Sequence, residues 1–191
     1  MKSIKGTRTE KNLLGAFAGE SQARNRYTYF AAQAQKEGFE QIAAIFTETA
    51  DQERIHAKNF FKQLEGGEVE ITAAFPAGVI GTTLENLKAS AAGEHHEQSD
   101  LYPAFAKVAK EEGFDEIARL FLNVANAELG HEQRYEALAK LVEEGKVFKR
   151  GEKVRWRCRK CGFTHEGLEA AGKCPACGHP QAYFEVLGEH Y

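Results

Sequence analysis

The chain has 191 residues, with 25 Lys and Arg against 28 Asp and Glu and a formal net charge of −3. This length is enough for one sizeable hydrophobic core and a small second unit, and the charge provides no positive field for a nucleic acid. No stretch is apolar enough to cross a membrane, and the first residues lack the apolar run of a signal peptide. Four cysteines in two Cys-x-x-Cys pairs indicate metal ligands in a reducing compartment. We therefore expect a cytoplasmic protein that binds neither nucleic acid nor membrane.

The first predicted helix covers about residues 7–37. Thr7-x-x-Glu10 is typical of a helix start, because both side chains can accept hydrogen bonds from free backbone N–H groups of the first turn. The apolar face of this helix, spaced by three and four residues, is interrupted by Glu20. Tyr27 lies further along the same face, where it is either a hydrogen-bond donor to a carboxylate or an ordinary core residue.

The second predicted helix covers about residues 39–65 and follows a tight turn at Gly38. Its apolar face contains Glu53 and His56, one turn apart. The following segment, residues 67–81, could extend to about 50 Å, against about 40 Å for the helix before it. It is long enough to travel the length of a bundle, which permits the single long crossover of ferritin-like bundles.

Two further helices are predicted over about residues 82–112 and 114–144, with a second tight turn at Gly113. A second Thr-x-x-Glu pattern, Thr82-x-x-Glu85, opens the earlier of the two. Both carry ionisable residues where the apolar repeat requires core side chains: Glu94, Glu97, Glu128 and His131.

All seven of these ionisable residues lie at one height in the predicted bundle. Each is 15 to 19 residues from the turn at Gly38 or Gly113, which is about 22 to 29 Å along a helix. An unpaired buried carboxylate is very costly, so a layer of five carboxylates and two histidines indicates bound cations. The layer consists of Glu20, Glu53, His56, Glu94, Glu97, Glu128 and His131.

The pattern within this layer indicates two metal ions. Two Glu-x-x-His motifs, with one glutamate from each of the other two helices, are typical of di-iron and di-manganese carboxylate bundles. Glu97 is an additional acid, either a seventh ligand or a hydrogen-bonded partner of the ligands. A bundle with a polar core and no metal is the alternative, and a mixed iron–zinc site fits the same residues. His95 and His96 are interpreted as flanking polar residues.

The two helical hairpins repeat each other at an offset of 75 residues. The pairs that show this offset are Glu53 with Glu128, His56 with His131, and Tyr27 with Tyr102. Glu20 matches Glu94 at an offset of 74, so one extra residue lies between Glu94 and Tyr102. We predict a π-bulge there, because a helix usually absorbs one extra residue in this way at a functional site.

From about Gly151 the composition changes to arginine, lysine, glycine and cysteine. This segment is too short to fold on apolar burial alone, so we expect it to depend on a metal. Its four thiolates, Cys158, Cys161, Cys174 and Cys177, suit either iron or zinc. The redox-active bundle beside them favours iron, and His179 is either a surface residue or a contact near this centre.

The two sites in this order resemble the rubrerythrin family over essentially the whole chain. The resemblance implies an all-α four-helix ferritin-like bundle with one long crossover in residues 1–147. It also implies a small, metal-stabilised, β-rich rubredoxin-like domain in residues 148–191. Gly130 departs from what a helix favours, and the sequence does not explain it. The residues that carry the resemblance are Gly19-Glu20-Ser21-Gln22-Ala23-Arg24, Glu53-Arg54-Ile55-His56, Gly93-Glu94-His95-His96-Glu97, Glu128-Leu129-Gly130-His131 and the two cysteine pairs.

The resemblance also implies a function: a non-haem di-iron peroxidase that reduces hydrogen peroxide to water and protects against oxidative stress. Two irons would be bound by the seven residues of the layer and one iron by the four cysteines. His56 and Glu97 would exchange as ligands when the iron changes oxidation state, and Tyr27 and Tyr102 would help to manage protons. Electrons would come from NAD(P)H through a reductase and a donor such as rubredoxin, and the chain would form a head-to-tail homodimer.

Two other functions fit the residues. A ferroxidase would oxidise many ferrous ions with dioxygen, although nothing in the sequence suggests a storage cage. A metal-dependent redox sensor or scaffold would use a zinc ribbon to bind a partner.

Overall fold

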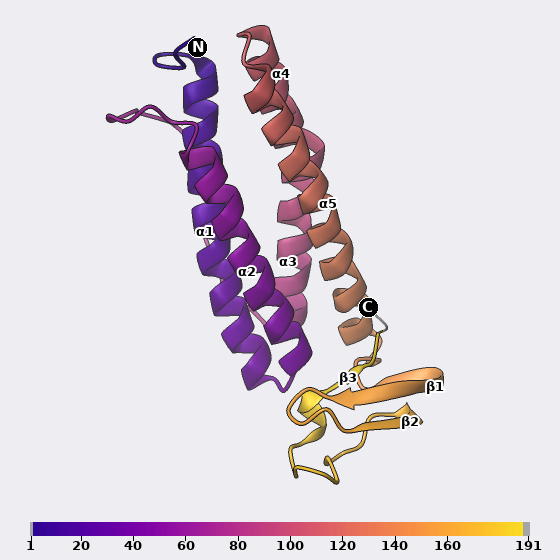
Figure 1. Cartoon of the computed structure of the whole chain (residues 1–191). Helices are drawn as coiled ribbons and strands as arrows, with labels where there is room; N and C mark the ends of the chain where they lie inside the picture. Colours follow the sequence, from indigo (N-terminus) through magenta and orange to yellow (C-terminus); the bar gives the residue numbers. More distant parts are fainter. Residues whose placement is uncertain (1, 189–191) are drawn as a thin grey trace.

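A computed structural model describes residues 2–188. The chain forms two long helical hairpins and a small sheet domain (Figure 1). The predicted ferritin-like bundle with a small C-terminal domain is therefore confirmed. The helices are α1 (Arg8–Lys36), α2 (Glu40–Phe61), α3 (Thr83–His96), η1 (Glu97–Leu101), α4 (Tyr102–Glu111) and α5 (Asp115–Glu143). The sheet domain contains β1 (Lys149–Cys158), β2 (Thr164–Glu169), a 3₁₀ turn η2 (Gln181–Tyr183) and β3 (Phe184–Val186).

The two hairpins turn at opposite ends of the bundle. The turn between α1 and α2 lies beside the sheet domain, and the turn between α4 and α5 lies at the far end (Figure 1). Gly38 and Gly113 occupy these turns with φ of 82° and 81°, a conformation that favours glycine. Residues 64–82 contain no helix or strand and connect the hairpins, as the predicted crossover requires.

Both predicted helix starts are present. Thr82 and Glu85 form a complete capping box at the start of α3. At the start of α1, Thr7 Oγ1 accepts a hydrogen bond from the N–H of Glu10 at 3.1 Å, and the Glu10 carboxylate accepts from the N–H of Gly6 at 2.8 Å. The side-chain acceptors thus satisfy donors that a helix start leaves free.

The second helix ends earlier than predicted, at Phe61 instead of about residue 65. Glu65 is instead used as an acceptor for the amino-terminal segment. Its carboxylate accepts hydrogen bonds from Ser3 Oγ at 2.6 Å and from the N–H of Ile4 at 2.9 Å. This long-range contact favours a turn over a further helical turn.

The predicted π-bulge is present as η1, between α3 and α4. The N–H of Tyr102 donates to the carbonyl of Glu97, five residues earlier, which defines a π-turn. Pro103, which has no N–H, follows directly in the first turn of α4. The extra residue lets Glu94 and Tyr102 both face the bundle interior, where each is buried.

The hydrophobic core of the bundle has two parts. One contains Tyr27, Phe46 and Tyr135 toward the sheet domain, and the other contains Phe60 and Phe121 toward the far end. The predicted layer of ionisable residues lies between them, so apolar packing closes it from both sides.

The sheet domain has the strand order β2-β1-β3, and β1 is antiparallel to both neighbours. Trp156 and Phe184 are fully buried against the cysteine-bearing loops. The domain contacts the α1–α2 turn, where the rings of Phe39 and Phe148 stack with centroids 6.1 Å apart.

Candidate metal centres

The bundle interior contains a cluster of carboxylates and histidines contributed by four helices. Glu20 comes from α1, Glu53 from α2, Glu94 from α3 and Glu128 from α5, and each is at most 1% exposed. Two histidines complete the cluster. His56 and His131 lie one turn after Glu53 and Glu128, and their rings stack with centroids 5.9 Å apart.

The ligand atoms of this cluster fall into two groups, each with all atoms within 4.8 Å of one another. One group is Glu20, Glu53, His56 and Glu128, and the other is Glu53, Glu94, Glu128 and His131. Two carboxylates, Glu53 and Glu128, belong to both groups, so the cluster could hold two adjacent metal ions that share these residues.

The unpaired atoms of the cluster test whether cations fit. His131 Nδ1 lies 2.6 Å from Glu128 Oε2 and 3.2 Å from Glu53 Oε1, yet it makes no well-directed hydrogen bond. Buried polar atoms without partners are rare in proteins, and here they converge. A pair of cations would supply the missing partner for each, so the residues fit a di-metal site. These atoms are Glu20 Oε2, Glu53 Oε1, Glu94 Oε2, both carboxylate oxygens of Glu128 and His131 Nδ1.

The raised pKa values of the cluster residues also indicate a site that favours positive charge. Burial and the neighbouring carboxylates raise the pKa of Glu20 and of Glu94 well above the usual range. Burial lowers the pKa of His56, but Glu128 and Glu53 outweigh it and raise the pKa to about 10. The same balance raises the pKa of His131 to about 9. Without metal the cluster thus retains protons, and bound cations would displace them.

Tyr27 and Tyr102 are both core residues and hydrogen-bond donors. The hydroxyl of Tyr27 donates to Glu94 Oε1 at 2.5 Å, and the hydroxyl of Tyr102 donates to Glu20 Oε1. Each tyrosine thus holds a glutamate that belongs to only one ligand group. One oxygen of each glutamate is engaged, and the other is directed into the cluster.

Glu97 lies beside the cluster and belongs to neither ligand group among the described residues. It lies on η1 and lines a cavity of about 270 Å³ together with Gly19, Arg26 and Phe75. Burial and the charges of Glu128 and Glu53 raise the pKa of Glu97 to about 8. The carboxylate is therefore close enough to interact with the cluster, although the structure places His56 at the ligand position.

The histidines next to Glu94 point away from the cluster, as interpreted from the sequence. His95 and His96 are both exposed, and His95 Nδ1 lies 2.8 Å from Glu132 Oε1. They are polar residues of the surface.

Sequence analysis missed Gln52 and Arg134. His131 Nε2 lies 2.9 Å from Gln52 Oε1, and Arg134 Nη2 donates to the same oxygen at 3.3 Å. The available signal was the position of Gln52 one turn before His56, next to a buried ligand. That position does not reveal that its side chain reaches His131 on α5.

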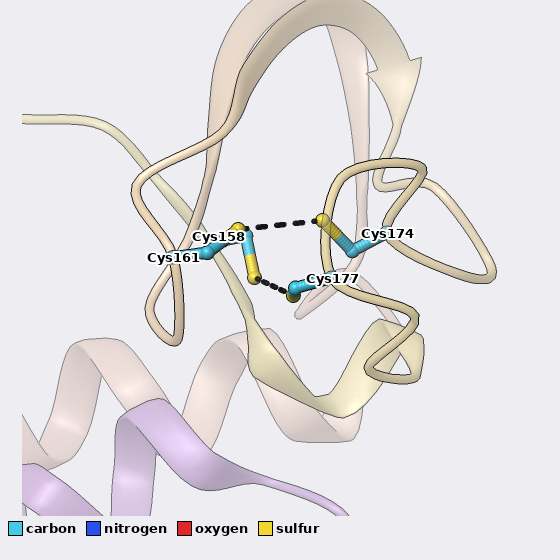
Figure 2. Close-up of side chains that lie close together, drawn as sticks. All are labelled: Cys158, Cys161, Cys174 and Cys177. Carbon is cyan, nitrogen blue, oxygen red and sulfur yellow. Dashed lines mark hydrogen bonds between the residues drawn. The ribbon is translucent and has the colours of Figure 1, made fainter.

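The four cysteines form a second candidate centre in the sheet domain (Figure 2). Cys158 Sγ lies 3.8 Å from Cys177 Sγ, and Cys161 Sγ lies 3.6 Å from Cys174 Sγ. Disulfide sulfurs are about 2.05 Å apart, whereas four thiolates about 2.3 Å from one metal are separated by about 3.8 Å. The spacing therefore fits a tetrathiolate metal site.

Two glycines shape the loops that carry these cysteines. The N–H of Gly162 donates to the carbonyl of Cys158 at 2.8 Å, and the N–H of Gly178 donates to that of Cys174 at 2.9 Å. Both glycines have positive φ, 80° and 74°, as the turns require. His179 packs its ring against Tyr183 with centroids 4.8 Å apart.

The fold and the two centres together define a ferritin-like di-iron carboxylate protein with a rubredoxin-like four-cysteine domain. The chain belongs to the rubrerythrin family. The family model described as "Rubrerythrin" matches residues 11–139, and the model described as "Rubrerythrin, rubredoxin-like domain" matches residues 156–185. The family consists of iron-dependent oxidoreductases, and its members are oligomeric.

Individual relatives cover nearly the whole chain. The rubrerythrin of Nitratidesulfovibrio vulgaris is 62% identical over 188 residues, which is 98% of each protein. The rubrerythrin of Porphyromonas gingivalis is 61% identical over 190 residues, covering 100% of this chain and 95% of that protein. A structure of fully reduced, all-ferrous nigerythrin is 33% identical with a TM-score of 0.63, and the match covers 97% of this chain and 92% of that one.

Within residues 2–188, no helix combines the length and the apolar character that a bilayer crossing needs.

Proposed function

We propose that this protein is a peroxidase that reduces hydrogen peroxide to two molecules of water. The reaction consumes two electrons and two protons for each peroxide. The observation that carries the proposal is that one chain contains a two-metal carboxylate–histidine cluster and a tetrathiolate site. The first can supply two electrons at one place, and the second can accept and donate one electron at a time.

We assign the metal ligands by the two groups of converging atoms. One iron would be held by Glu20, Glu53, His56 and Glu128, and the other by Glu53, Glu94, Glu128 and His131. When bound and ferrous, the irons supply the two electrons that break the O–O bond. The third iron would be held by Cys158, Cys161, Cys174 and Cys177.

The proposed role of Glu97 follows from the charge that the di-iron site gains on oxidation. Two ferrous ions carry +4, which the four ligand carboxylates balance, and loss of two electrons adds two positive charges to a buried site. An anionic carboxylate beside the cluster would offset part of this charge. We propose that Glu97 replaces the neutral His56 as a ligand when the site is oxidised.

The hydroxyl groups of Tyr27 and Tyr102 donate hydrogen bonds to Glu94 and Glu20, the two glutamates that belong to one ligand group each. We propose that they hold Glu94 and Glu20 in position and take part in delivering protons.

The separation of the two centres within one chain supports a homodimer. The four-cysteine domain contacts the α1–α2 turn, where a Cβ added to Gly38 would lie 3.7 Å from Ala182 Cβ. The ligands on α2 begin about 22 Å further along the helix. In a head-to-tail dimer the four-cysteine domain of one subunit would lie close to the di-iron site of its partner.

The wider setting is also part of the proposal. A donor such as rubredoxin, reduced by an NAD(P)H-dependent reductase, would supply electrons in the cytoplasm and link the protein to oxidative-stress protection. We assign residues 1–147 to the di-iron unit and residues 148–191 to the electron-transfer unit.

Anaerobic stopped-flow of the fully reduced, iron-loaded protein tests this function. Hydrogen peroxide and dioxygen are added in separate experiments, and the return of the coloured ferric–thiolate band is followed. We expect fast, peroxide-selective oxidation with about one peroxide consumed for each electron pair. Preferred reaction with dioxygen would indicate a ferroxidase instead. Absence of ferric–thiolate colour after iron loading would indicate a zinc-binding scaffold.

A further inference from the structure

The two histidines of the di-iron cluster have different surroundings on the side of the ring that faces away from the metals. His131 Nδ1 faces the carboxylates, and its Nε2 lies 2.9 Å from Gln52 Oε1. His56 Nδ1 also faces the carboxylates, at 2.9 Å from Glu128 Oε1. Within residues 2–188, however, no group forms a hydrogen bond with His56 Nε2. The two rings are thus held unequally.

Arg134 fixes the orientation of the Gln52 side chain. A guanidinium can only donate hydrogen bonds, and Arg134 Nη2 lies 3.3 Å from Gln52 Oε1. The atom that faces Arg134 and His131 must therefore be the amide oxygen. The amide nitrogen of Gln52 donates in the opposite direction, to Glu48 Oε1 at 3.3 Å. Both ends of the amide are engaged, so it cannot rotate without losing a partner.

This orientation determines which nitrogen of His131 is free for a metal. Because Gln52 offers an acceptor, His131 Nε2 must carry the proton of the neutral ring. The lone pair is then on Nδ1, which is the atom that faces the cluster. Outer hydrogen bonds of this kind fix the tautomer and ring orientation of metal-binding histidines.

The internal repeat shows that this arrangement is present on one side only. The offset of 75 that relates His56 to His131 also relates Gln52 to Ala127 and Asn59 to Arg134. Ala127 has no hydrogen-bonding side chain, so it cannot accept a hydrogen bond from His56 as Gln52 does from His131.

We propose that Gln52 and Arg134 are positioning residues that hold His131 as an Nδ1 ligand. They thereby make the metal position on the His131 side the tighter of the two. The inference requires the bundle to bind metal, but it does not require that metal to reduce peroxide. It can therefore fail while the proposed peroxidase function holds, and the reverse is also true.

The test uses Zn²⁺ as a diamagnetic probe bound to the full chain. Affinities are measured by competition with a chelator, and the four-cysteine site serves as an internal reference because no variant changes it. We expect two bundle positions of unequal affinity in the unchanged protein. The Gln52→Ala variant should weaken the tighter position by about 10- to 100-fold. The Gln133→Ala variant, an exposed change on the same helix as Arg134, should have no effect.

Nuclear magnetic resonance of the zinc-loaded protein supplies a readout that a merely structural role would not change. A histidine N–H held by Gln52 should give a slowly exchanging downfield proton signal on His131 Nε2. We expect Gln52→Ala to abolish this signal and Gln52→Glu, which keeps an acceptor, to retain it. The Ala127→Gln variant should add a second such signal, on His56, and tighten the weaker metal position.

Three results would overturn the proposal. The first is an unchanged affinity and an unchanged His131 signal in Gln52→Ala. The second is an equal loss at both bundle positions, and the third is the same loss in Gln133→Ala. Either of the last two would mean that the substitutions act on the fold in general. Circular dichroism of each variant establishes whether the helices are retained.

Discussion

Tyr27 and Tyr102 act on the cluster through single hydrogen bonds. Each donates to a glutamate that belongs to one ligand group only, and both phenol groups are at most 1% exposed. A hydrogen bond to a charged group contributes about 1.5–3 kcal/mol. Each tyrosine therefore determines which oxygen of Glu94 or Glu20 remains available to a metal.

The Tyr102→Phe variant tests the importance of this bond. Loss of about 1.5–3 kcal/mol corresponds to a fall of about 10- to 100-fold in the rate of peroxide reduction. Single-turnover stopped-flow with the iron-loaded protein measures that rate. The matched control is Tyr135→Phe, because Tyr135 is equally buried but its hydroxyl donates to no carboxylate of the cluster among residues 2–188. An equal loss in both variants would show that packing, and not the hydrogen bond, is responsible.

Gly130 offers a prediction about stability. It lies inside α5, its φ is not positive, and an added Cβ would meet nothing within 4 Å. Nothing in the structure explains the glycine. Because glycine costs about 1 kcal/mol relative to alanine inside a helix, Gly130→Ala should raise the free energy of unfolding by about that amount. Urea denaturation measures it, and a decrease in stability would reveal a constraint on this turn of α5.

The helices are positioned by contacts at their ends as well as by the core. Glu112, at the end of α4, accepts hydrogen bonds from Thr9 Oγ1 at 2.6 Å and from the N–H of Thr9 at 2.9 Å. It also forms an ion pair with Arg8 at 3.2 Å. These contacts join the start of α1 to the end of α4 and satisfy an N–H group that a helix start leaves free.

The Glu112→Gln variant should show a pH-dependent loss of stability. The Thr9 hydroxyl, the N–H groups of Thr9 and Arg8 and the Arg8 side chain lower the pKa of Glu112 to about 2. The ionised form therefore stabilises the fold fully above the ordinary pKa of 4.5, and this contribution declines as the pH falls toward 2. We expect a loss of about 1 kcal/mol at pH 7 that shrinks below pH 4.5. Urea denaturation of metal-free protein over this range measures it, and a loss independent of pH would contradict the ionic explanation.

The π-turn η1 sets the rotation of α4 relative to α3. Removing one residue from it would turn the following helix by about 100°, so Glu94 and Tyr102 could no longer both face the interior. Deletion of Ser99, which is exposed, should therefore leave the four-cysteine iron in place and remove most of the bundle iron. Iron analysis together with the intensity of the ferric–thiolate band measures both. Deletion of Glu68 in the crossover is the control, and equal iron loss there would contradict a specific role for η1.

At the scale of the whole molecule, the proposed function divides the reaction between two centres. The four-cysteine centre would deliver electrons, and the bundle would use them to reduce peroxide. Cys161 is the exposed member of the four-cysteine centre. Cys161 lies in the sheet domain, outside the helices that carry the bundle ligands, so a change there leaves those ligands in place.

The Cys161→Ser variant should separate the two steps. We expect re-reduction of the di-iron site to slow by at least about tenfold, because the electron-transfer centre is altered. Oxidation of the chemically reduced bundle by peroxide should remain within about twofold of the unchanged protein. Stopped-flow with chemical pre-reduction measures each step separately. Equal damage to both steps would mean that the centres do not divide the reaction in this way.

Much of this arrangement follows from counting along the sequence. The distance of each ligand from Gly38 or Gly113 predicts one layer, and the crossover length predicts how the hairpins join. The single-residue mismatch between Glu20 and Glu94 predicts η1. These features depend on helical geometry alone, which fixes rise and rotation for each residue.

Other features depend on contacts between distant side chains and are not determined by spacing. Glu65, which lies beyond the early end of α2, accepts a hydrogen bond from the N–H of Ile4, a contact that spacing along the chain does not reveal. The tie between Gln52 and His131 depends on how α2 and α5 are rotated against each other. The position of Glu97 outside both ligand groups likewise reflects the geometry of the π-turn and the cavity beside it.

The crossover between the hairpins contributes none of the six clustered ligands. Each hairpin instead supplies the same set, two glutamates and one histidine: Glu20, Glu53 and His56 from α1 and α2, and Glu94, Glu128 and His131 from α3 and α5. Two copies of one such hairpin, associated about a twofold axis, would offer the same donors without any connecting chain. The bundle thus has the form of a fused dimer, in which a duplicated ancestor could have held both metals before its halves were joined and began to differ.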